Sequence, residues 1–157
     1  MSNVFRLSTT EILEQCLTHC HASRSDEDAE NVEKALIMHA MAEGKLYLPF
    51  STQKEDAHTH AIDPAFAAID DKLYFVAYTS PEHAADSPIC EIMEVSVSFF
   101  LRLPIGAMED EKVDGYIIDP VVTGNDVKGR TFSKDQARST LEKIRMLTTP
   151  SPAVIPQ

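Results

Sequence analysis

The segment from Leu73 to Tyr78 constrains the fold of this chain more than any other, because it is apolar on both of its alternating faces. Successive side chains of a strand project to opposite faces of a sheet. A strand that is apolar on both faces has to be covered on both sides. The segment therefore predicts a central strand in a sheet that carries helices on both faces.

Two helices are expected before the first strand. Ser8 and Glu11 form a capping box, in which each side chain bonds the free backbone N–H of the other residue, and apolar residues follow at helical spacing as far as Cys20. A second helix is expected from Ser25, with three acidic residues in its first turn, where the helix dipole favours negative charge. Gly44 is its expected C-cap.

Three further helices are expected in the second half of the chain. Ser80 and Pro81 indicate a short helix start, and Ser98 indicates another that ends before Pro104. Ser133 and its capping partner three residues later open a last amphipathic helix. The apolar face of that helix consists of Ala137, Leu141, Ile144 and Leu147.

About five strands are expected between these helices. Pro49 cannot donate a hydrogen bond to a neighbouring strand, so the first strand should lie at an edge or end there. Asp70-Asp71 predicts a hairpin turn. The residues from Ser51 to Pro64 and from Gly124 to Arg130 are expected to form loops. The expected strands are Lys45–Phe50, Ala65–Ile69, Leu73–Tyr78, Cys90–Val97 and Gly115–Asp119.

The combined pattern predicts one α/β domain with a mixed sheet (α+β), in the order ααβββαβαβα, over residues 1–147. A length of 157 residues is typical of one domain. Residues 148–157 contain three prolines and are expected to extend from the domain as a tail.

Charge and hydropathy exclude several classes of partner. The chain carries 25 acidic and 14 basic residues, a net charge of -11, which disfavours nucleic acid and anionic membrane surfaces. No apolar run approaches the length of a membrane helix, and the first ten residues do not resemble a secretory signal. Three cysteines argue against a disulfide framework. We therefore expect a cytoplasmic protein whose partner is another protein or a second copy of the chain.

Three short phrases carry a resemblance to a known family. They are Leu46-Tyr47-Leu48-Pro49, Phe75-Val76-Ala77-Tyr78-Thr79-Ser80-Pro81-Glu82 and Gly115-Tyr116-Ile117-Ile118-Asp119-Pro120. Over about residues 29 to 147 the chain resembles the SseB N-terminal domain family of bacteria, named for enhanced serine sensitivity. The resemblance implies a fold and brings no catalytic residues. Full-length members often carry a second, C-terminal domain, for which these 157 residues leave no room.

Two groups of residues have the composition of a metal site. Cys16, His19 and Cys20 share one helix face, because residues three and four apart are neighbours. Such ligands can hold zinc, which needs a fourth ligand in a structural site. The alternative is that both cysteines are small core residues and that His19 is solvated. We favour the alternative.

The second group is Asp56, His58 and His60. Alternate residues of an extended segment project to one side, so both imidazoles and the carboxylate could face one ion. His39 could complete such a site from the second helix. The alternatives are a polar loop and, for His39, a buried neutral histidine with one hydrogen bond. We favour these alternatives too and expect no cofactor.

The segment from Ser98 to Leu103 suggests a surface that contacts a partner. Phe99, Phe100, Leu101 and Leu103 are too many apolar side chains for one face of a short helix. Some of them are therefore candidates for an exposed interaction patch, and core packing is the alternative.

The sequence contains no nucleophile or phosphate-binding motif. We therefore expect a non-enzymatic interaction or adaptor domain. Two alternatives stay open: a small metal-dependent enzyme or binder that uses His58 and His60, and a sensor of an amino-acid-like ligand, which only the family name suggests.

Overall fold

The computed structural model describes residues 8–56, 59–85, 91–106, 113–123 and 126–148, without the side chains of residues 51–64 and 84–85. Within these ranges it contains five helices and nine strands, more strands than the sequence predicts. They are α1 (Thr9–Ser23), α2 (Asp26–Met41), β1 (Lys45–Asp56), β2 (Thr59–Pro64), β3 (Phe66–Ile69), β4 (Lys72–Ala77), α3 (Pro81–Ala85), β5 (Glu91–Ser96), α4 (Val97–Gly106), β6 (Val113–Ile118), β7 (Val121–Thr123), β8 (Asp126–Lys128), β9 (Phe132–Ser133) and α5 (Lys134–Thr148).

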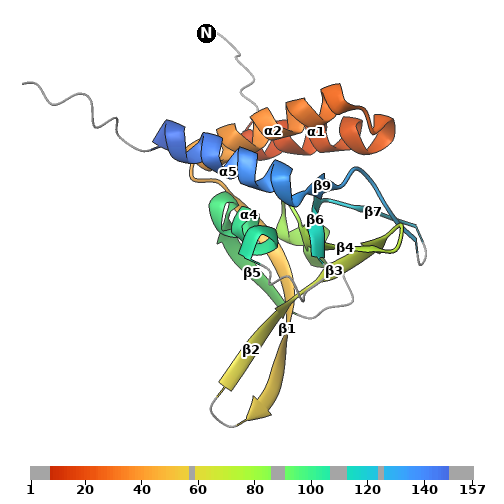
Figure 1. Cartoon of the computed structure of the whole chain (residues 1–157), viewed down its shortest axis with the longest axis vertical. Helices are drawn as coiled ribbons and strands as arrows, with labels where there is room; N and C mark the ends of the chain where they lie inside the picture. Colours follow the sequence, from red (N-terminus) through yellow and green to blue (C-terminus); the bar gives the residue numbers. More distant parts are fainter. Residues whose placement is uncertain (1–7, 57–58, 86–90, 107–112, 124–125, 149–157) are drawn as a thin grey trace, which may run out of the picture.

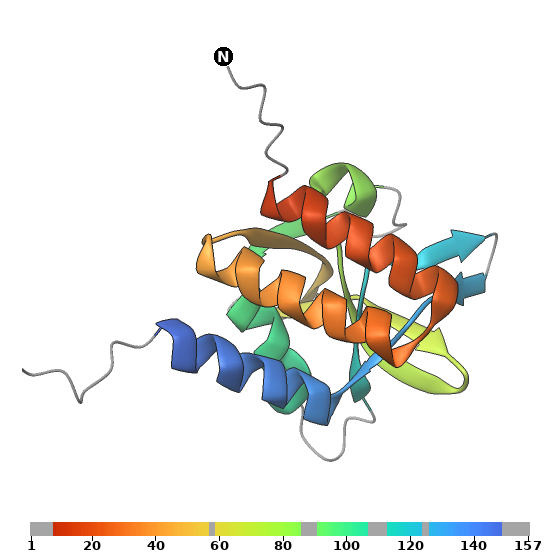
Figure 2. The same ribbon diagram turned by 90° about the horizontal axis from the view of Figure 1, so that it is seen from above.

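Three of the helices form one layer over the strands. The helices α1, α2 and α5 lie side by side with α2 in the middle, and α4 lies below α5 (Figures 1 and 2). The four-stranded sheet has the order β3-β4-β6-β9, in which β4 and β6 are parallel and the other neighbours are antiparallel. The three-stranded sheet has the order β2-β1-β5. The predicted class, a mixed-sheet α/β domain, is confirmed.

The central position predicted for residues 73–78 is also confirmed, since β4 lies between β3 and β6. On one face Phe75 and Ala77 belong to the main core, which the helices cover. On the other face Tyr74 and Val76 belong to a smaller cluster that includes Val127 of β8. No helix residue belongs to this smaller cluster among the described residues, so a β-ribbon takes the place of the expected second helical layer.

Local signals in the sequence set the element boundaries. The Oγ of Ser8 accepts the N–H of Glu11 at 3.1 Å, and Ser25 caps α2 in the same way. Ser133 and Gln136 bond each other reciprocally at 3.1 and 2.8 Å. The N-caps predicted at Ser8, Ser25 and Ser133 are confirmed, because each depends on residues that are close in the chain.

The turn at Asp70-Asp71 is confirmed as well. Both residues have positive φ, 52° and 64°, as a two-residue type I′ hairpin turn requires. Aspartate tolerates this left-handed conformation better than most residues. The turn fixes the register between β3 and β4 and places Lys72 at the first position of β4.

The predicted C-cap of α2 at Gly44 is wrong. Glu43 adopts the left-handed conformation with φ of 57°, and Gly44 donates its N–H to the carbonyl of His39 at 2.7 Å. Gly44 is needed for space: a Cβ there would lie 2.2 Å from the His39 ring.

The prediction that the first strand ends or becomes an edge at Pro49 is wrong. β1 continues to Asp56 and lies between β2 and β5. The Pro49 carbonyl accepts the N–H of Ala65 at 2.9 Å. Because the N and O atoms of a strand residue face the same side, the missing N–H faces Ala65 and interrupts no bond to β5.

Both predicted loops contain strands. Most of the segment from Ser51 to Pro64 forms the antiparallel hairpin of β1 and β2, which projects from the body of the domain (Figure 1). Residues 126–128 form β8, which pairs with β7. Short strands of polar residues lack the apolar alternation by which a strand is recognised, and this explains why the prediction missed them.

Helix α4 begins earlier and ends later than predicted. Ser96, and not Ser98, is the N-cap, since its Oγ accepts the N–H of Phe99 at 3.1 Å. Pro104 lies inside the helix and is buried. At the other end of the chain, Leu147 is 58% exposed and does not join the apolar face of α5. The predicted tail from 148 lies outside the described residues, except that Thr148 ends α5.

Candidate functional site

The cysteine group on α1 does not form a metal site. Cys20 is fully buried in the core, Cys16 is partly buried against it, and His19 is exposed. Burial raises the pKa of both thiols above the ordinary value of 9.0, which keeps them protonated. Within the described part of the chain, no three His, Cys, Asp or Glu side chains form a group that could hold a metal ion.

The group in the β1–β2 hairpin is only partly described. Asp56 is the last residue of β1, and its backbone pairs with Thr59 of β2. The backbone of His60 pairs with Lys54. His58 lies outside the described residues, as do the side chains of Asp56 and His60. The metal hypothesis for this hairpin therefore stays a prediction.

His39 lies in the core, where both ring nitrogens are bonded. Its Nε2 donates to the Lys45 carbonyl at 2.9 Å, and its Nδ1 lies 2.7 Å from the Thr9 hydroxyl. Because a carbonyl can only accept, Nε2 is the donor to Lys45, and Nδ1 is engaged by the Thr9 hydroxyl. His39 has two hydrogen bonds where one was expected, and neither nitrogen is free to bind a metal or to act as a base.

His21 is a buried histidine that the sequence did not reveal. Its Nε2 donates to the carbonyl of Ile118 at 2.7 Å, and its Nδ1 accepts the backbone N–H of Arg130 at 2.9 Å. Desolvation lowers its pKa below 6.5, against the opposing effects of the Ile118 carbonyl and the Asp119 carboxylate. A neutral ring fits both bonds, because protonation would add a second donor facing the Arg130 N–H.

The three family-like phrases meet at the carboxyl ends of β4 and β6. Tyr47 and Tyr78 exchange backbone hydrogen bonds of 2.8 and 2.9 Å. The carboxylate of Asp119 accepts the backbone N–H of Thr79 at 2.9 Å and its hydroxyl at 2.6 Å. Asp119 has φ of 51°, so it turns out of β6 in a left-handed conformation before Pro120. The N–H that Asp119 accepts belongs to a residue 40 positions away in the chain.

Two more titratable side chains border this contact. The hydroxyl of Thr79 also lies 3.0 Å from Glu14 Oε1, and His83 Nδ1 lies 3.6 Å from Asp119 Oδ2. A threonine hydroxyl has a single proton to donate, so two carboxylates share it. Thr79 is 2% exposed. A substrate could not reach this hydroxyl, and the arrangement serves to close the end of the sheet.

The apolar segment of α4 divides between core and surface. Phe100 and Leu101 are fully buried, and the ring of Phe100 packs edge-on against Tyr116 at 5.5 Å. Leu103 is partly buried, whereas Phe99 is 45% exposed. Two of the four residues of the expected patch are therefore core residues, and Phe99 is its exposed member.

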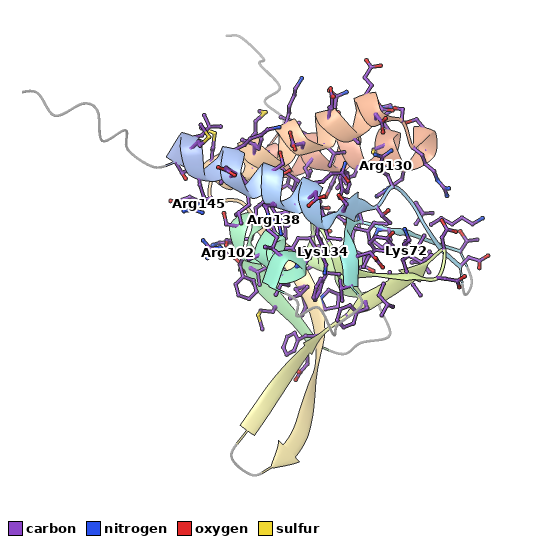
Figure 3. All side chains as sticks on the ribbon, viewed as in Figure 1. Lys72, Arg102, Arg130, Lys134, Arg138 and Arg145 are labelled. Carbon is purple, nitrogen blue, oxygen red and sulfur yellow. The ribbon has the colours of Figure 1, made fainter. Side chains whose placement is uncertain are left out.

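Basic side chains occur on α4, beyond Phe99, and on α5, which packs against α4. Arg102 lies three positions further along α4, on the same exposed side. Lys134, Arg138 and Arg145 follow one face of α5, because spacings of four and seven residues return to the same side of a helix. Figure 3 shows these side chains along α5 with Arg102 beside them. We call Phe99, Arg102, Lys134, Arg138 and Arg145 the basic face.

The cations of the basic face are largely uncommitted. Among the described residues, only Arg138 forms an ion pair, with Asp135 at 3.0 Å, and both partners are well exposed. Such surface pairs contribute little. Lys143, on another side of α5, is bonded to Glu33 of α2 and does not belong to this face. The spacing within α5 is visible in the sequence, but the contribution of Arg102 depends on the packing of α4 against α5.

Comparison with known proteins identifies no relative: no family model, no curated protein and no solved structure matches the chain. None of the described helices has the length and apolar composition needed to span a membrane.

Proposed function

We propose that this chain is a non-enzymatic protein-binding domain whose basic face holds an acidic segment of a partner protein. One observation carries the proposal. In a chain of net charge -11, Arg102 follows the exposed Phe99 by three positions on α4, and three further cations lie along one face of α5, which packs against α4. Arginine and aromatic side chains are enriched at protein interfaces, whereas acidic residues are depleted there.

The overall negative charge of the chain does not oppose such a contact at short range. At physiological salt, charges more than about 8 Å apart are largely screened from each other. A partner segment on α5 therefore senses chiefly the nearby charges, which are the four cations of the basic face together with Asp135 and Glu142 of α5. The helix is about 22 Å long, which accommodates a short helix or strand.

A protein partner suits this face better than nucleic acid. Nucleic-acid binding neutralises many phosphates at once and needs clustered basic residues over a wide surface. The basic face has four cations and the exposed ring of Phe99, and Leu103 is partly exposed on the same helix as Phe99. An acidic segment with apolar residues of its own can bury these apolar side chains.

The remaining features of the proposal rest on sequence alone. We infer a cytoplasmic bacterial protein similar to the SseB N-terminal domain family, without a cofactor. The hypothesis of a metal-dependent enzyme is less favoured, because both nitrogens of His39 are used in the core.

Fluorescence anisotropy can test the proposal with a defined probe. The probe is a labelled peptide that alternates glutamate and leucine, and its control is the same peptide with glutamine in place of glutamate. The domain should bind the acidic peptide and not the control. The double variant Arg138→Glu, Arg145→Glu should lose at least about tenfold in affinity, ~1.4 kcal/mol.

A matched variant separates local from overall charge. Lys34→Glu with Lys128→Glu changes the net charge by the same amount, and both lysines are exposed away from the basic face. This variant should bind the acidic peptide within about twofold of the wild type, as expected for remote screened charges. Equal losses in both variants, or tighter binding of labelled single-stranded DNA than of the peptide, would contradict the proposal.

A further inference from the structure

A second site lies beyond the start of α5, near Lys72 and Arg130 (Figure 3). A cavity of about 520 Å³ opens there between the β3–β4 hairpin, the start of β6 and the segment that leads into α5. Its volume lies within the range of small-molecule sites, about 300–1,000 Å³. Four segments that are distant in sequence contribute to its lining, so the cavity is a product of the tertiary fold.

One wall of the cavity is held in a fixed position. The buried ring of His21 accepts the N–H of Arg130 at 2.9 Å. Gly129, the preceding residue, has φ of 148°, and a Cβ there would lie 2.7 Å from His21 Nδ1. The wall therefore needs glycine both for its conformation and for its close approach to the histidine.

The charged side chains that line the cavity differ in whether they are bonded to the rest of the domain. Arg130 is tied down, since its guanidinium donates to the Arg24 carbonyl at 2.8 Å and to Asp26 at 3.0 Å. The Lys72 ammonium and the Arg24 guanidinium form no bond within the described residues. Asp70 and Asp114 also line the cavity, and neither forms an ion pair with another described residue. Within the part of the chain that the structure describes, the lining thus offers two cations and two carboxylates that are not paired.

We propose that this cavity binds a small anion that carries hydrogen-bond donors of its own, such as the phosphate ester of a polyol. Lys72 and Arg24 would hold the anionic group, near the N-terminus of α5, where the helix dipole favours negative charge. Asp70 and Asp114 would accept hydrogen bonds from the hydroxyl groups. This site is separate from the basic face and does not depend on the proposed function.

Isothermal titration calorimetry at constant ionic strength tests this assignment with three probes: glycerol phosphate, inorganic phosphate and glycerol. Glycerol phosphate should give a saturable isotherm, inorganic phosphate a weaker one and glycerol none. The variant Lys72→Gln should weaken glycerol phosphate by about tenfold, the cost of one charge-assisted hydrogen bond. The control Lys128→Gln, outside the cavity lining, should bind as the wild type does.

Three results would overturn the assignment. They are an absence of saturable heat with glycerol phosphate, equal affinity for inorganic phosphate, and equal losses in the two lysine variants. To exclude unfolding as a cause of lost binding, each variant is first melted without ligand. A change of a surface lysine should leave its stability within about 0.5 kcal/mol of the wild type.

Discussion

The two ends of the parallel pair β4 and β6 differ sharply in how their polar groups are used. At the carboxyl end, Asp119 accepts two hydrogen bonds from Thr79, and Glu14 and His83 border the same contact. At the amino end, the side chains of Lys72 and Asp114 face a cavity, and neither bonds another described residue. Open α/β sheets commonly bind ligands at the carboxyl ends of their strands. Here that end is closed by the domain's own side chains, so uncommitted polar groups, and not strand direction, indicate the place of binding.

The hydrogen bonds at the carboxyl end of the pair also offset the cost of the left-handed conformation of Asp119. A left-handed conformation costs a residue such as Asp119 about 1–2 kcal/mol. Hydrogen bonds to a charged group contribute about 1.5–3 kcal/mol each, so the two bonds from Thr79 offset that cost. At the amino end, the bonds of Arg130 hold one wall of the cavity, and its shape also depends on tight packing around Gly115 and Gly129.

The largest effect is expected at the amino end, from Gly115→Ala. A Cβ at Gly115 would lie 1.7 Å from the carbonyl oxygen of Phe132, so β9 would have to move away from β6. We expect a loss of about 3 kcal/mol or more in the free energy of unfolding, since the clash is with backbone. Urea denaturation measures it.

The matched control is Gly106→Ala at the end of α4, where nothing lies within 4 Å of an added Cβ. Its free energy of unfolding should stay within about 0.5 kcal/mol of the wild type. Similar losses at Gly106 and Gly115 would show that the amino end is not closely packed.

A smaller effect is expected at the carboxyl end. Asp119→Ala leaves the buried Thr79 N–H without its acceptor and leaves Glu14 as the acceptor of the Thr79 hydroxyl, for which we expect a loss of about 2 kcal/mol. Asp119→Asn should lose less, because asparagine tolerates the left-handed conformation and keeps one acceptor oxygen. Thermal denaturation of the two variants decides this order. Equal stability of the wild type and Asp119→Ala would contradict the claim that the bonds between Thr79 and Asp119 stabilise the carboxyl end of the pair.

The pH dependence of stability tests His21, which links the two ends through Ile118 and Arg130. Its folded pKa is lowered, so the unfolded chain binds a proton that the folded protein excludes as the pH falls below 6.5. Stability should therefore decrease with falling pH, by at most about 1.4 kcal/mol per pH unit from this group. The decrease ends once the pH is below the folded pKa.

The variant His21→Gln isolates this contribution. Because glutamine does not titrate, the stability of the variant should fall less steeply than that of the wild type between neutral and mildly acidic pH. Urea denaturation across this range gives both slopes. Parallel slopes would mean that His21 is not held neutral.

The smallest effect on stability is expected from Asp114→Asn in the cavity. Its side chain is exposed and has no ion-pair partner among the described residues. The free energy of unfolding should therefore change by no more than about 0.5 kcal/mol. A larger loss in urea denaturation would show that the amino end uses this carboxylate for its own structure.

The structural features that the sequence predicts correctly are those formed by residues close together in the chain. The caps at Ser8, Ser25 and Ser133 and the turn at Asp70-Asp71 were all predicted, because each involves residues at most three positions apart. The contact of Thr79 with Asp119 spans 40 residues and left no local signal. It is a product of the parallel pairing of β4 and β6.

The error in α4 shows how a small shift changes a candidate site. With Ser98 as the cap, Phe99 and Phe100 are equivalent candidates for exposure. With Ser96 as the cap, the helix begins at Val97 and turns Phe100 into the core while Phe99 faces solvent. The basic face could be predicted only in part, since Arg102 joins α5 by packing between helices.

The most direct test of the account is a map of where the acidic peptide binds. Backbone amide shifts of the isotope-labelled domain are followed by NMR during titration with the unlabelled peptide. The account predicts that the shifts concentrate on α4 and α5, around Phe99 and Arg138, and leave Thr79 and Asp119 unchanged. Shifts centred on the Thr79 and Asp119 end, or an absence of saturable shifts on α5, would contradict it.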